Sequence, residues 1–498
     1  MKYHTIALLL VALLFSANST TAQYITHGPV IGAVTSNSCK VYVRTKQCGR
    51  VLMELSEDSL LQKSFSVGAN TDSLRDKTAM LSITSLKPDT RYFYRLLFEG
   101  WEDSIKGSFR TFPVEGTRGD FTLVTGSCQE TPNMKVFDVM PKHNPYFLLH
   151  TGDYTYPDYQ ICPWYSNNYD TVAYAYRRRY DEKVMKEMLY NMPIDYMHDD
   201  NDYVGGSGGE FCKNDMRSFR RNGKVYNEMY ALPFPPHWRR NVIKGYDEFF
   251  PHYDLPDTTQ GIFHSFKFGN AEFFVIDRNS NKALPNMDAF TYDSVRNRWS
   301  FNPPPGYALF GKVQMDWLKK KLLESTADWK FIVSGVPLNG ACEKLIRAGV
   351  KIQKWHYKNW YGFHIASGFA QYWAGYPEER NDFMQFLKTN NIKNVLVISG
   401  DTHHNVMDDG KNAGLPELNA SGLSVETTEL AHYLKLIGNL TGLYPMNKIW
   451  NKGGNGLKGK DSKNAFGKVR IVGNDYVELS IVDEDDKVVS SFKVPYVH

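Results

Sequence analysis

The stretch that decides the fold is Phe147–Tyr156, with the sequence FLLHTGDYTY. Its short apolar run ends in Thr-Gly-Asp, which is how a buried strand finishes and delivers a carboxylate, that of Asp153, at its carboxyl end. Open α/β sheets bind their ligands at this end of their strands. We therefore expect a buried strand that begins near Phe147, with a functional carboxylate directly behind it.

Three other apolar runs end in the same way. Residues 121–128 end in the thiol of Cys128, residues 194–202 end in a cluster of carboxylates, and residues 395–404 end in Asp401 and two histidines. Such side chains bind metal ions or transfer protons. Four strand ends that carry them predict one site with more than one metal ion.

The pattern around these strands changes near residue 120. Before it, residues 24–113 form short alternating segments separated by turn residues, which predicts a small β-sandwich. Within it, Leu86–Tyr92 is typical of the corner before a strand in fibronectin-type sandwiches. After residue 120, apolar strands alternate with helical stretches, the pattern of an α/β domain. The elements expected there are helices at 171–190, 314–323 and 377–387, a hairpin at 262–276 and a terminal β-meander at 467–494.

Two stretches are expected to shape the approach to the site. Residues 204–260 are rich in Gly, Asn, Pro and aromatic residues and are predicted to be long loops, and residues 341–372 are assigned the same role. The basic run Arg177–Arg179, on the helix expected at 171–190, is either a solvated face or a source of attraction for phosphate.

Length and charge limit the class of protein. A chain of 498 residues is too long for one ordinary core, so two or more domains are expected. The formal net charge of +4 is small for this length, and it predicts no specific nucleic-acid partner and no strong attraction to a membrane surface.

The N-terminus has the features of a secretory signal peptide. Lys2 provides a positive start, residues 6–15 are almost all apolar, and Thr20-Thr21-Ala22 provides a cleavage site of small residues. The apolar run is too short to span a bilayer. We therefore expect removal of residues 1–22, a mature chain without a transmembrane segment, and a secreted or periplasmic location.

Export would place the six cysteines in an oxidising compartment. Cys39 and Cys48 could then close a hairpin, and Cys162 and Cys212 could staple the long loop region. For Cys128, which follows Gly-Ser at a strand end, a metal-ligand role and a disulfide both remain open.

The chemistry of the candidate ligands favours two kinds of metal ion. The thiolate of Cys128, the phenolate of Tyr156 and the imidazole of His403 suit a ferric ion better than magnesium. Carboxylates and a carbonyl suit a hard cation such as calcium, and the candidates for it are Asp153, Asp200, Asp401 and Asn339. Asp153 can supply an oxygen to each ion. Two metals a few ångströms apart can clamp a phosphoryl group and generate a hydroxide between them.

Seven motifs together resemble the alkaline phosphatase D family, within the calcineurin-like metallophosphoesterases. They occur in the family's order and, with the N-terminal sandwich and the final meander, span nearly the whole mature chain. The motifs are Gly126–Gln129, Gly152–Tyr156, Asp199–Tyr203, Leu309–Gln314 with Trp317, Trp329-Lys330, Tyr376–Arg380 and Gly400–His403.

The resemblance implies the fold and the metals. The fold class is α/β (an α+β sandwich), with a metallophosphoesterase β-sandwich core flanked by helices at residues 120–498 and a fibronectin-like all-β domain at residues 24–113. It also implies Fe3+ and one or more Ca2+ ions. By position, Cys128, Asp153, Tyr156 and His403 would hold the iron, and Asp153, Asp200 and Asp401 would face calcium.

Two positions differ from the family pattern. The family has an arginine slightly beyond a strand-end aspartate that holds phosphate; here Asp277-Arg278 is a shortened version, which makes Arg278 a candidate. The family also has a histidine, which contacts phosphate or protonates the leaving group, where this chain has Asn201. An amide cannot give up a proton, so Asp202, His404 or water would have to supply it.

The expected function is that of an exported, metal-dependent phosphoesterase in which a metal-bound hydroxide attacks phosphorus. Its substrate would be a small-molecule or lipid phosphate ester, and phosphomonoesters and phosphodiesters both stay open. Asn201 motivates one alternative, a non-catalytic cell-surface binding protein built on a phosphatase scaffold. Another metallohydrolase, acting on a sulfate ester or a lactone, is the second alternative.

Overall fold

The computed structural model describes most of the chain after residue 23. The described residues are 24–131, 134–156, 165–203, 236–282, 289–293, 295–296, 298–352, 366, 368–424, 448–455 and 463–498. The expected signal peptide, Cys162, Cys212 and a large part of the two expected loop stretches lie outside these residues.

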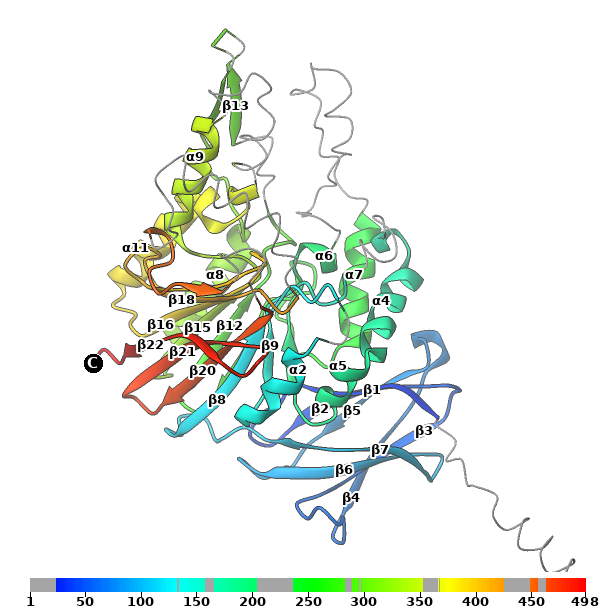
Figure 1. Cartoon of the computed structure of the whole chain (residues 1–498). Coiled ribbons are helices and arrows are strands. Elements are labelled where there is room, and N and C mark those ends of the chain that lie inside the picture. Colours follow the sequence, from blue (N-terminus) through cyan, green and yellow to red (C-terminus); the bar gives the residue numbers. More distant parts are fainter. Residues whose placement is uncertain are drawn as a thin grey trace, which may run out of the picture.

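The N-terminal region consists of two small antiparallel sheets, which lie at the bottom of Figure 1. One contains β1 (Ile25–Gly32), β2 (Cys39–Thr45) and β5 (Thr78–Ile83), and the other contains β4 (Phe65–Asn70), β3 (Arg50–Ser56), β6 (Arg91–Phe98) and β7 (Trp101–Arg110). The corner expected at Leu86–Tyr92 is present, because the Tyr92 hydroxyl accepts a hydrogen bond of 2.9 Å from the Lys87 backbone N–H. Phe112 joins this region to the rest of the protein through its contacts with Phe147 and Phe268, at ring-centroid distances of 5.1 and 4.9 Å.

The expected link between Cys39 and Cys48 is wrong, since both are free cysteines. Cys39 begins β2 and is buried, whereas Cys48 is exposed and follows the end of the same strand. Seven residues of extended strand span about 20 Å, which is far more than a disulfide bridges.

Two larger sheets form the centre of the protein (Figure 1). Strands β8, β9 and β10 are parallel neighbours in the first sheet, and the antiparallel meander β20–β22 continues it. Strands β12, β15, β16 and β18 are parallel neighbours in the second. In spatial order, the first sheet contains β10 (Ile194–Tyr196), β9 (Leu148–His150), β8 (Asp120–Gly126), β20 (Ala465–Val472), β21 (Tyr476–Asp483) and β22 (Val488–Pro495). The second contains β11 (His264–Phe268), β12 (Ala271–Ile276), β15 (Trp329–Ser334), β16 (Val395–Ser399), β18 (Pro416–Ala420), β17 (Asn405–Asp409) and β19 (Gly454–Asn455).

The sheets pack against each other because their strands are apolar on both faces. In β12, Phe273 and Val275 join the core between the sheets, while Phe274 and Ile276 face the opposite way. In β9, Leu149 lies in the same central core and Leu148 faces outward. Successive side chains of a strand point to opposite faces, so continuous apolar runs of this kind need cover on both sides.

Helices provide that outer cover, which confirms the expected α/β sandwich. Val172, Tyr176 and Tyr180 of α4 pack with Leu148 on the first sheet, and Leu318 of α8 packs with Ile332 on the second. Figure 1 places α4, α5 and α7 on one side of the molecule and α8, α9 and α11 on the other. The helices of the described residues are α2 (Val136–Val139), α4 (Tyr169–Asp181), α5 (Lys183–Leu189), α6 (Asp200–Tyr203), α7 (Pro236–Phe249), α8 (Gly311–Glu324), α9 (Glu343–Ile352) and α11 (Pro377–Thr389). Shorter elements are a hairpin of β13 (Phe290–Asp293) and β14 (Arg298–Phe301) and the 3-10 turns η1 (Ser73–Arg75), η2 (Met140–His143), η3 (Tyr165–Asn167), η6 (Gly340–Cys342) and η7 (Trp373–Gly375).

Two predicted segments differ from the structure. The helix expected at 171–190 is two helices, because Glu182 is extended (φ −64°, ψ 118°) and separates α4 from α5. The stretch predicted as loops at 204–260 contains α7, whose Val242, Tyr246 and Phe249 are fully buried at helical spacing. The Gly and Pro residues of this stretch led to the prediction of loops, although the spacing of its apolar residues is that of a helix.

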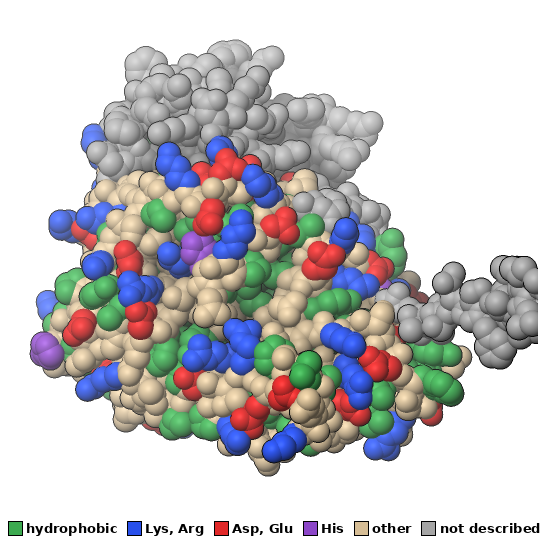
Figure 2. Space-filling view, turned by 60° about the horizontal axis from the view of Figure 1, so that its bottom comes forward, with side chains coloured by type: hydrophobic (Ala, Val, Ile, Leu, Met, Phe, Trp, Pro, Cys, Tyr) green, Lys and Arg blue, Asp and Glu red, His purple; other side chains and the backbone are tan. Residues whose placement is uncertain are grey.

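In the described part of the chain, we find no helix with the length and apolar character that a membrane crossing requires. The face shown in Figure 2 carries acidic and basic side chains interspersed over its surface.

Candidate metal centre

The carboxyl ends of strands from both sheets meet at one place. Cys128 follows β8, Asp153 follows β9, and Asp199 and Asp200 follow β10 in the first sheet. Arg278 follows β12, and Asp401 and His403 follow β16, in the second. Parallel strands within a sheet end at a common edge, so packing the two sheets face to face brings these five chain segments together.

The first cluster contains a thiol, a carboxyl group, a phenol and an imidazole. Ligand atoms of Cys128, Asp153 and His403 all lie within 4.8 Å of one another. The Cys128 Sγ is 3.6 Å from Asp153 Oδ2, and the Tyr156 hydroxyl is 3.2 Å from the same oxygen and 3.4 Å from His403 Nε2. All four residues expected to hold iron are therefore neighbours.

The second cluster is made of carboxylates. Oxygens of Asp153, Asp199, Asp200 and Asp401 lie within 4.8 Å of one another. Asp153 belongs to both clusters, as expected for a carboxylate shared by two ions. Asp199 was not among the candidate ligands, although it stands next to Asp200 at the same strand end. Its Oδ2 is buried and has no hydrogen-bond partner among the described residues, which leaves an oxygen that can bind a ligand.

The backbone at the site is strained at five positions. Cys128 (φ 60°), Asp153 (φ 56°), Tyr156 (φ 43°), Asp401 (φ 69°) and His403 (φ 55°) all adopt left-handed conformations that non-glycine residues rarely occupy. Such residues persist only where the surroundings hold them, and they gather at functional sites.

The loops behind β8 and β9 hold each other. The Cys128 N–H donates to the Gly152 carbonyl at 3.3 Å, and the Gln129 N–H donates to the Asp153 carbonyl at 2.9 Å. Gly152 has φ 100°, and a Cβ at this position would lie 2.4 Å from the Cβ of Asp199. Only glycine at position 152 therefore lets the loop that carries Asp153 approach the segment that carries Asp199.

Burial of so many acidic groups in one place changes their pKa values. Burial, followed by the charges of neighbouring carboxylates, raises the pKa of Asp153 well above its usual range. Burial also raises the pKa of Asp199, against the lowering effect of Arg278, and raises that of the Cys128 thiol to about 12. A metal cation bound between these donors would favour the ionised forms that burial opposes. The residues therefore fit a site for metal ions.

Arg278 lies fully buried among the carboxylates. Its Nε donates to Asp199 Oδ1, and its Nη2 lies 3.1 Å from Asp401 Oδ1 and 3.2 Å from Asp200 Oδ1. Its Nη1 is buried and has no hydrogen-bond partner among the described residues. The guanidinium is thus fixed by three acidic side chains and keeps one donor for an anion.

Asn201 is turned toward the shared carboxylate. Its backbone N–H donates to Asp153 Oδ1 at 3.1 Å, and its Nδ2 donates to Asp153 Oδ2 at 2.9 Å. The side-chain oxygen of Asn201 is buried without a hydrogen-bond partner in the described part of the chain. Asn201 therefore orients Asp153 with the donor that its amide offers.

Three other candidates make structural hydrogen bonds. The Asp202 carboxylate accepts from the N–H groups of Tyr154, Thr155 and Asp199 and from the Thr155 hydroxyl, so it holds the loop before Tyr156. The side-chain oxygen of Asn339 caps η6 by accepting from the Ala341 N–H at 2.8 Å, and its Nδ2 donates to the Ile449 carbonyl at 2.8 Å. These contacts occupy the groups through which Asp202 and Asn339 were expected to act.

His404 is also placed by a structural contact. Its Nδ1 lies 2.5 Å from the Thr402 carbonyl, and burial lowers its pKa to about 4. A histidine with this pKa is neutral at pH 7, so it carries little of the acid form that a proton donor needs.

Comparison with known proteins gives one family. The model described as PhoD-like phosphatase matches residues 123–431, and the model of the PhoD-like phosphatase N-terminal domain matches residues 12–113. A curated relative, alkaline phosphatase D of Bacillus subtilis (strain 168), is 24% identical over 336 residues, which cover 64% of this chain. The match spans 52% of that relative, about half of its length.

Two solved structures share the fold. A structure of PhoD matches with a TM-score of 0.66 and 18% identity, over 95% of this chain and 91% of that one. A purple acid phosphatase from yellow lupin (Lupinus luteus) seeds matches with a TM-score of 0.51 and 12% identity, over 94% and 74% of the two chains. The expected metallophosphoesterase-type fold, with its strand-rich N-terminal region, is confirmed.

Proposed function

Because the chain belongs to the PhoD-like phosphatase family, we propose that it is a metal-dependent phosphoesterase. The observation that carries this proposal is the convergence of two donor clusters on Asp153, one with sulfur, phenol and imidazole and one with carboxylates alone. Two adjacent sites with one shared carboxylate are the arrangement that a phosphoryl-transferring metal pair requires.

The two clusters differ in the ions that they suit. Cys128, Asp153, Tyr156 and His403 offer soft and phenolic donors, which favour a ferric ion. Asp153, Asp199, Asp200 and Asp401 offer only oxygen, which favours calcium. When bound, these ions would supply an activated water and would take up negative charge from the phosphoryl oxygens.

The chain's own residues would bind and orient the substrate. The Nη1 of Arg278, which has no hydrogen-bond partner in the described part of the chain, would donate to a phosphoryl oxygen, and ion pairs of the guanidinium with three aspartates fix its direction. Asn201 holds the shared carboxylate of Asp153 through two hydrogen bonds. Neither residue supplies a proton to the leaving group.

Substrates whose leaving group departs without being protonated are therefore favoured. Small-molecule or lipid phosphate esters with acidic alcohols or phenols meet this requirement, and both monoesters and diesters do so. Export through a cleaved signal peptide completes the proposal, and it is supported by the sequence pattern of residues 1–22. The protein would then act outside the cytoplasm.

A second candidate function is a non-catalytic protein that binds phosphate esters at the same centre. Asn201 favours it, because an amide replaces the acid that the family places there and is engaged with Asp153. Such a protein would retain metal and bind phosphate without turnover.

The test is metal analysis combined with a substrate panel. Natively purified protein is expected to contain iron and calcium by elemental analysis and to hydrolyse aryl phosphate, bis-aryl phosphate or both, with competitive inhibition by vanadate. Bound metal without hydrolysis would favour the binding protein. Absence of bound metal would contradict both candidates, and hydrolysis of sulfate esters or lactones without inhibition by phosphate would indicate another metallohydrolase.

Matched variants locate the metals. Asp153→Asn should lose both metals, whereas Asp401→Asn should lose calcium and keep iron. Cys128→Ser should lose iron, while Cys342→Ser, at another buried and free cysteine in η6, should retain both ions. Equal metal content in Asp153→Asn and wild type would contradict a shared carboxylate.

A further inference from the structure

The contacts of the basic run Arg177–Arg179 on α4 differ from both roles expected from the sequence, a solvated face and a source of attraction for phosphate. Arg179 is fully buried, and Arg177 and Arg178 are partly buried. The run is therefore not a solvated face. Each of the three guanidinium groups contacts a different part of the protein, and two of those parts are the loops that carry Cys128 and Tyr156.

Arg179 holds the loop behind β8. Its Nη2 donates to the Gln129 carbonyl at 2.5 Å, and its Nη1 donates to both carboxylate oxygens of Glu182 at 2.7 and 2.6 Å. The Gln129 side chain donates to Glu182 in turn, at 3.3 Å. This closed and buried network contains Gln129, the residue directly after Cys128. The backbone of Cys128 is left-handed.

Arg178 holds the loop behind β9. Its Nη2 donates to the Thr155 carbonyl at 3.0 Å. Thr155 directly precedes Tyr156, which is again left-handed. Neighbouring arginines of one helix thus bind the carbonyls beside two strained residues, both of which belong to the proposed iron site.

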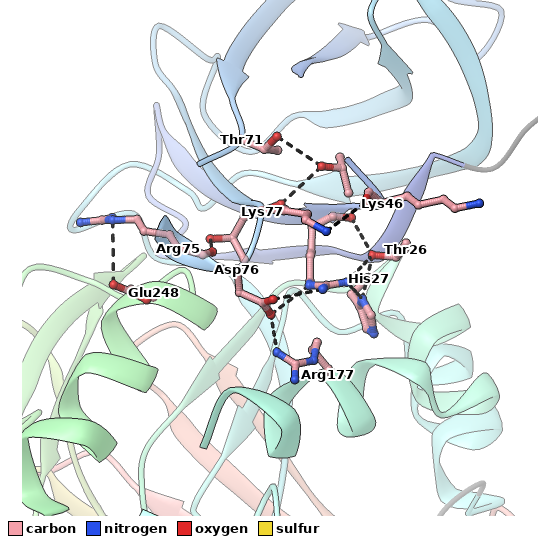
Figure 3. Close-up of polar contacts among 12 residues, drawn as sticks. Thr26, His27, Lys46, Thr71, Arg75, Asp76, Lys77, Arg177 and Glu248 are labelled. Atoms are coloured by element: carbon pink, nitrogen blue, oxygen red, sulfur yellow. Dashed lines mark hydrogen bonds and ion pairs between the residues drawn. The ribbon is translucent and has the colours of Figure 1, made fainter. Parts of the chain in front are cut away.

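Arg177 faces the N-terminal sheets instead. It forms an ion pair with Asp76, which also accepts from Arg44 of β2 at 3.0 and 3.1 Å. Figure 3 shows the Asp76 carboxylate between the N-terminal sheets and α4, with Arg75 directed toward Glu248 of α7 at 3.9 Å. Burial acts to raise the pKa of Asp76, but the hydrogen bond from Arg44 and the charges of Arg177 and Arg44 lower it overall, which keeps this carboxylate ionised.

We propose that the arginine run of α4 is a positioning device that links the N-terminal sheets to the metal-binding loops. Asp76 fixes α4 through Arg177, and α4 fixes the Cys128 and Tyr156 loops through Arg179 and Arg178. These arginines are positioning residues, since Arg178 and Arg179 contact the loops that carry the ligands and Arg177 contacts Asp76. The inference rests on the proposed function, because it assigns the loops to a metal centre.

The test uses the full chain with its native metals. Arg178→Met keeps the length of the side chain and removes its donors, and Arg178→Lys keeps one donor. We expect Arg178→Met to lose metal faster during dialysis against EDTA and to lower kcat about 10- to 100-fold with little change in KM, the range for residues that orient metal ligands. Arg178→Lys should recover most of the loss.

A distant arginine serves as the matched control. Arg470 of β20 forms an ion pair with Asp120 of β8, remote from the ligands along both strands. Arg470→Met should leave metal retention and kcat unchanged. Metal retention and kcat of Arg178→Met equal to those of wild type would overturn the proposal. A wild-type protein that holds no metal would instead refute the proposed function, so the two failures are distinguishable.

The link to the N-terminal sheets has its own variant. Asp76→Asn removes the charge that pairs with Arg177 and keeps the shape of the side chain. We expect the same direction of change as in Arg178→Met, with faster metal loss and lower kcat, but a smaller size. Metal retention in Asp76→Asn equal to that in wild type, together with a defect in Arg178→Met, would overturn the part assigned to the N-terminal sheets.

Discussion

Asn201 donates two hydrogen bonds to Asp153, one from its backbone N–H to Oδ1 at 3.1 Å and one from its Nδ2 to Oδ2 at 2.9 Å. Both oxygens of the shared carboxylate are thereby fixed by a single residue. The amide that replaces the expected histidine is thus a support for the metal centre. A histidine at this position would both contact the leaving group and position its neighbours. Asn201 performs only the second task, so the two tasks are separated in this protein.

The first prediction concerns that separation. Asn201→His should raise kcat on phosphate esters with poor leaving groups, such as alkyl phosphates, about tenfold or more, because general-acid help contributes on that scale. On nitrophenyl esters, whose nitrophenolate departs without being protonated, the same variant should show no gain in kcat. The measurement is kcat across a series of leaving-group pKa values. An unchanged slope across the series would mean that water or another residue already supplies the proton.

The second prediction concerns the colour of the protein. If Tyr156 binds a ferric ion, the purified protein should have a visible phenolate-to-metal absorption band, and Tyr156→Phe should lose it. Tyr154→Phe is the matched control, because Tyr154 is equally buried in the same loop and its hydroxyl has no hydrogen-bond partner in the described chain. A coloured Tyr156→Phe protein with full activity would exclude the ligand role.

Strand-end motifs made much of this centre predictable from the sequence. Cys128, Asp153, Asp401 and His403 each directly follow an apolar run, and topology brings such ends together. The sequence did not show that these ends belong to two sheets, because strand pairing is set by contacts between distant segments. It also did not show that Asp199 joins Asp200 in the cluster, since only packing decides whether both of two adjacent carboxylates face the others.

Side chains with distant hydrogen-bond partners were harder to predict. Asn339 donates to the Ile449 carbonyl, 110 residues further along the chain, and nothing in the local sequence indicates this contact. The basic run on α4 has the same difficulty, because the carbonyls of Gln129 and Thr155 and the carboxylate of Asp76 are distant in sequence. Local patterns identify residue chemistry, whereas the partners of buried polar groups depend on the complete fold.

The third prediction concerns two glycines with similar backbones. Gly152 has φ 100° and a Cβ there would lie 2.4 Å from Asp199, whereas Gly100 has φ 83° and nothing within 4 Å. Gly100→Ala should cost about 1 kcal/mol of unfolding free energy for the left-handed backbone alone. Gly152→Ala should cost about 2–4 kcal/mol and should also reduce bound metal, because Asp199 must move. Denaturant unfolding and elemental analysis measure both, and equal costs at the two positions would contradict the close approach of the ligand loops.

The last prediction concerns Glu417 of β18, a buried carboxyl group outside the two clusters. Burial raises its pKa to about 8, although hydrogen bonds from the Ser399 hydroxyl and the Leu338 N–H act in the opposite direction. The folded-state pKa lies above the unfolded value, so the stabilising effect is complete below about pH 4.5 and is lost as pH rises through 8. Glu417→Gln stays neutral throughout. It should therefore be as stable as wild type at pH 4 and more stable at pH 9, by about 3–5 kcal/mol. Unfolding free energies at pH 4 and pH 9 test this, and a variant whose stability falls with pH as steeply as that of wild type would assign the pH dependence to other groups.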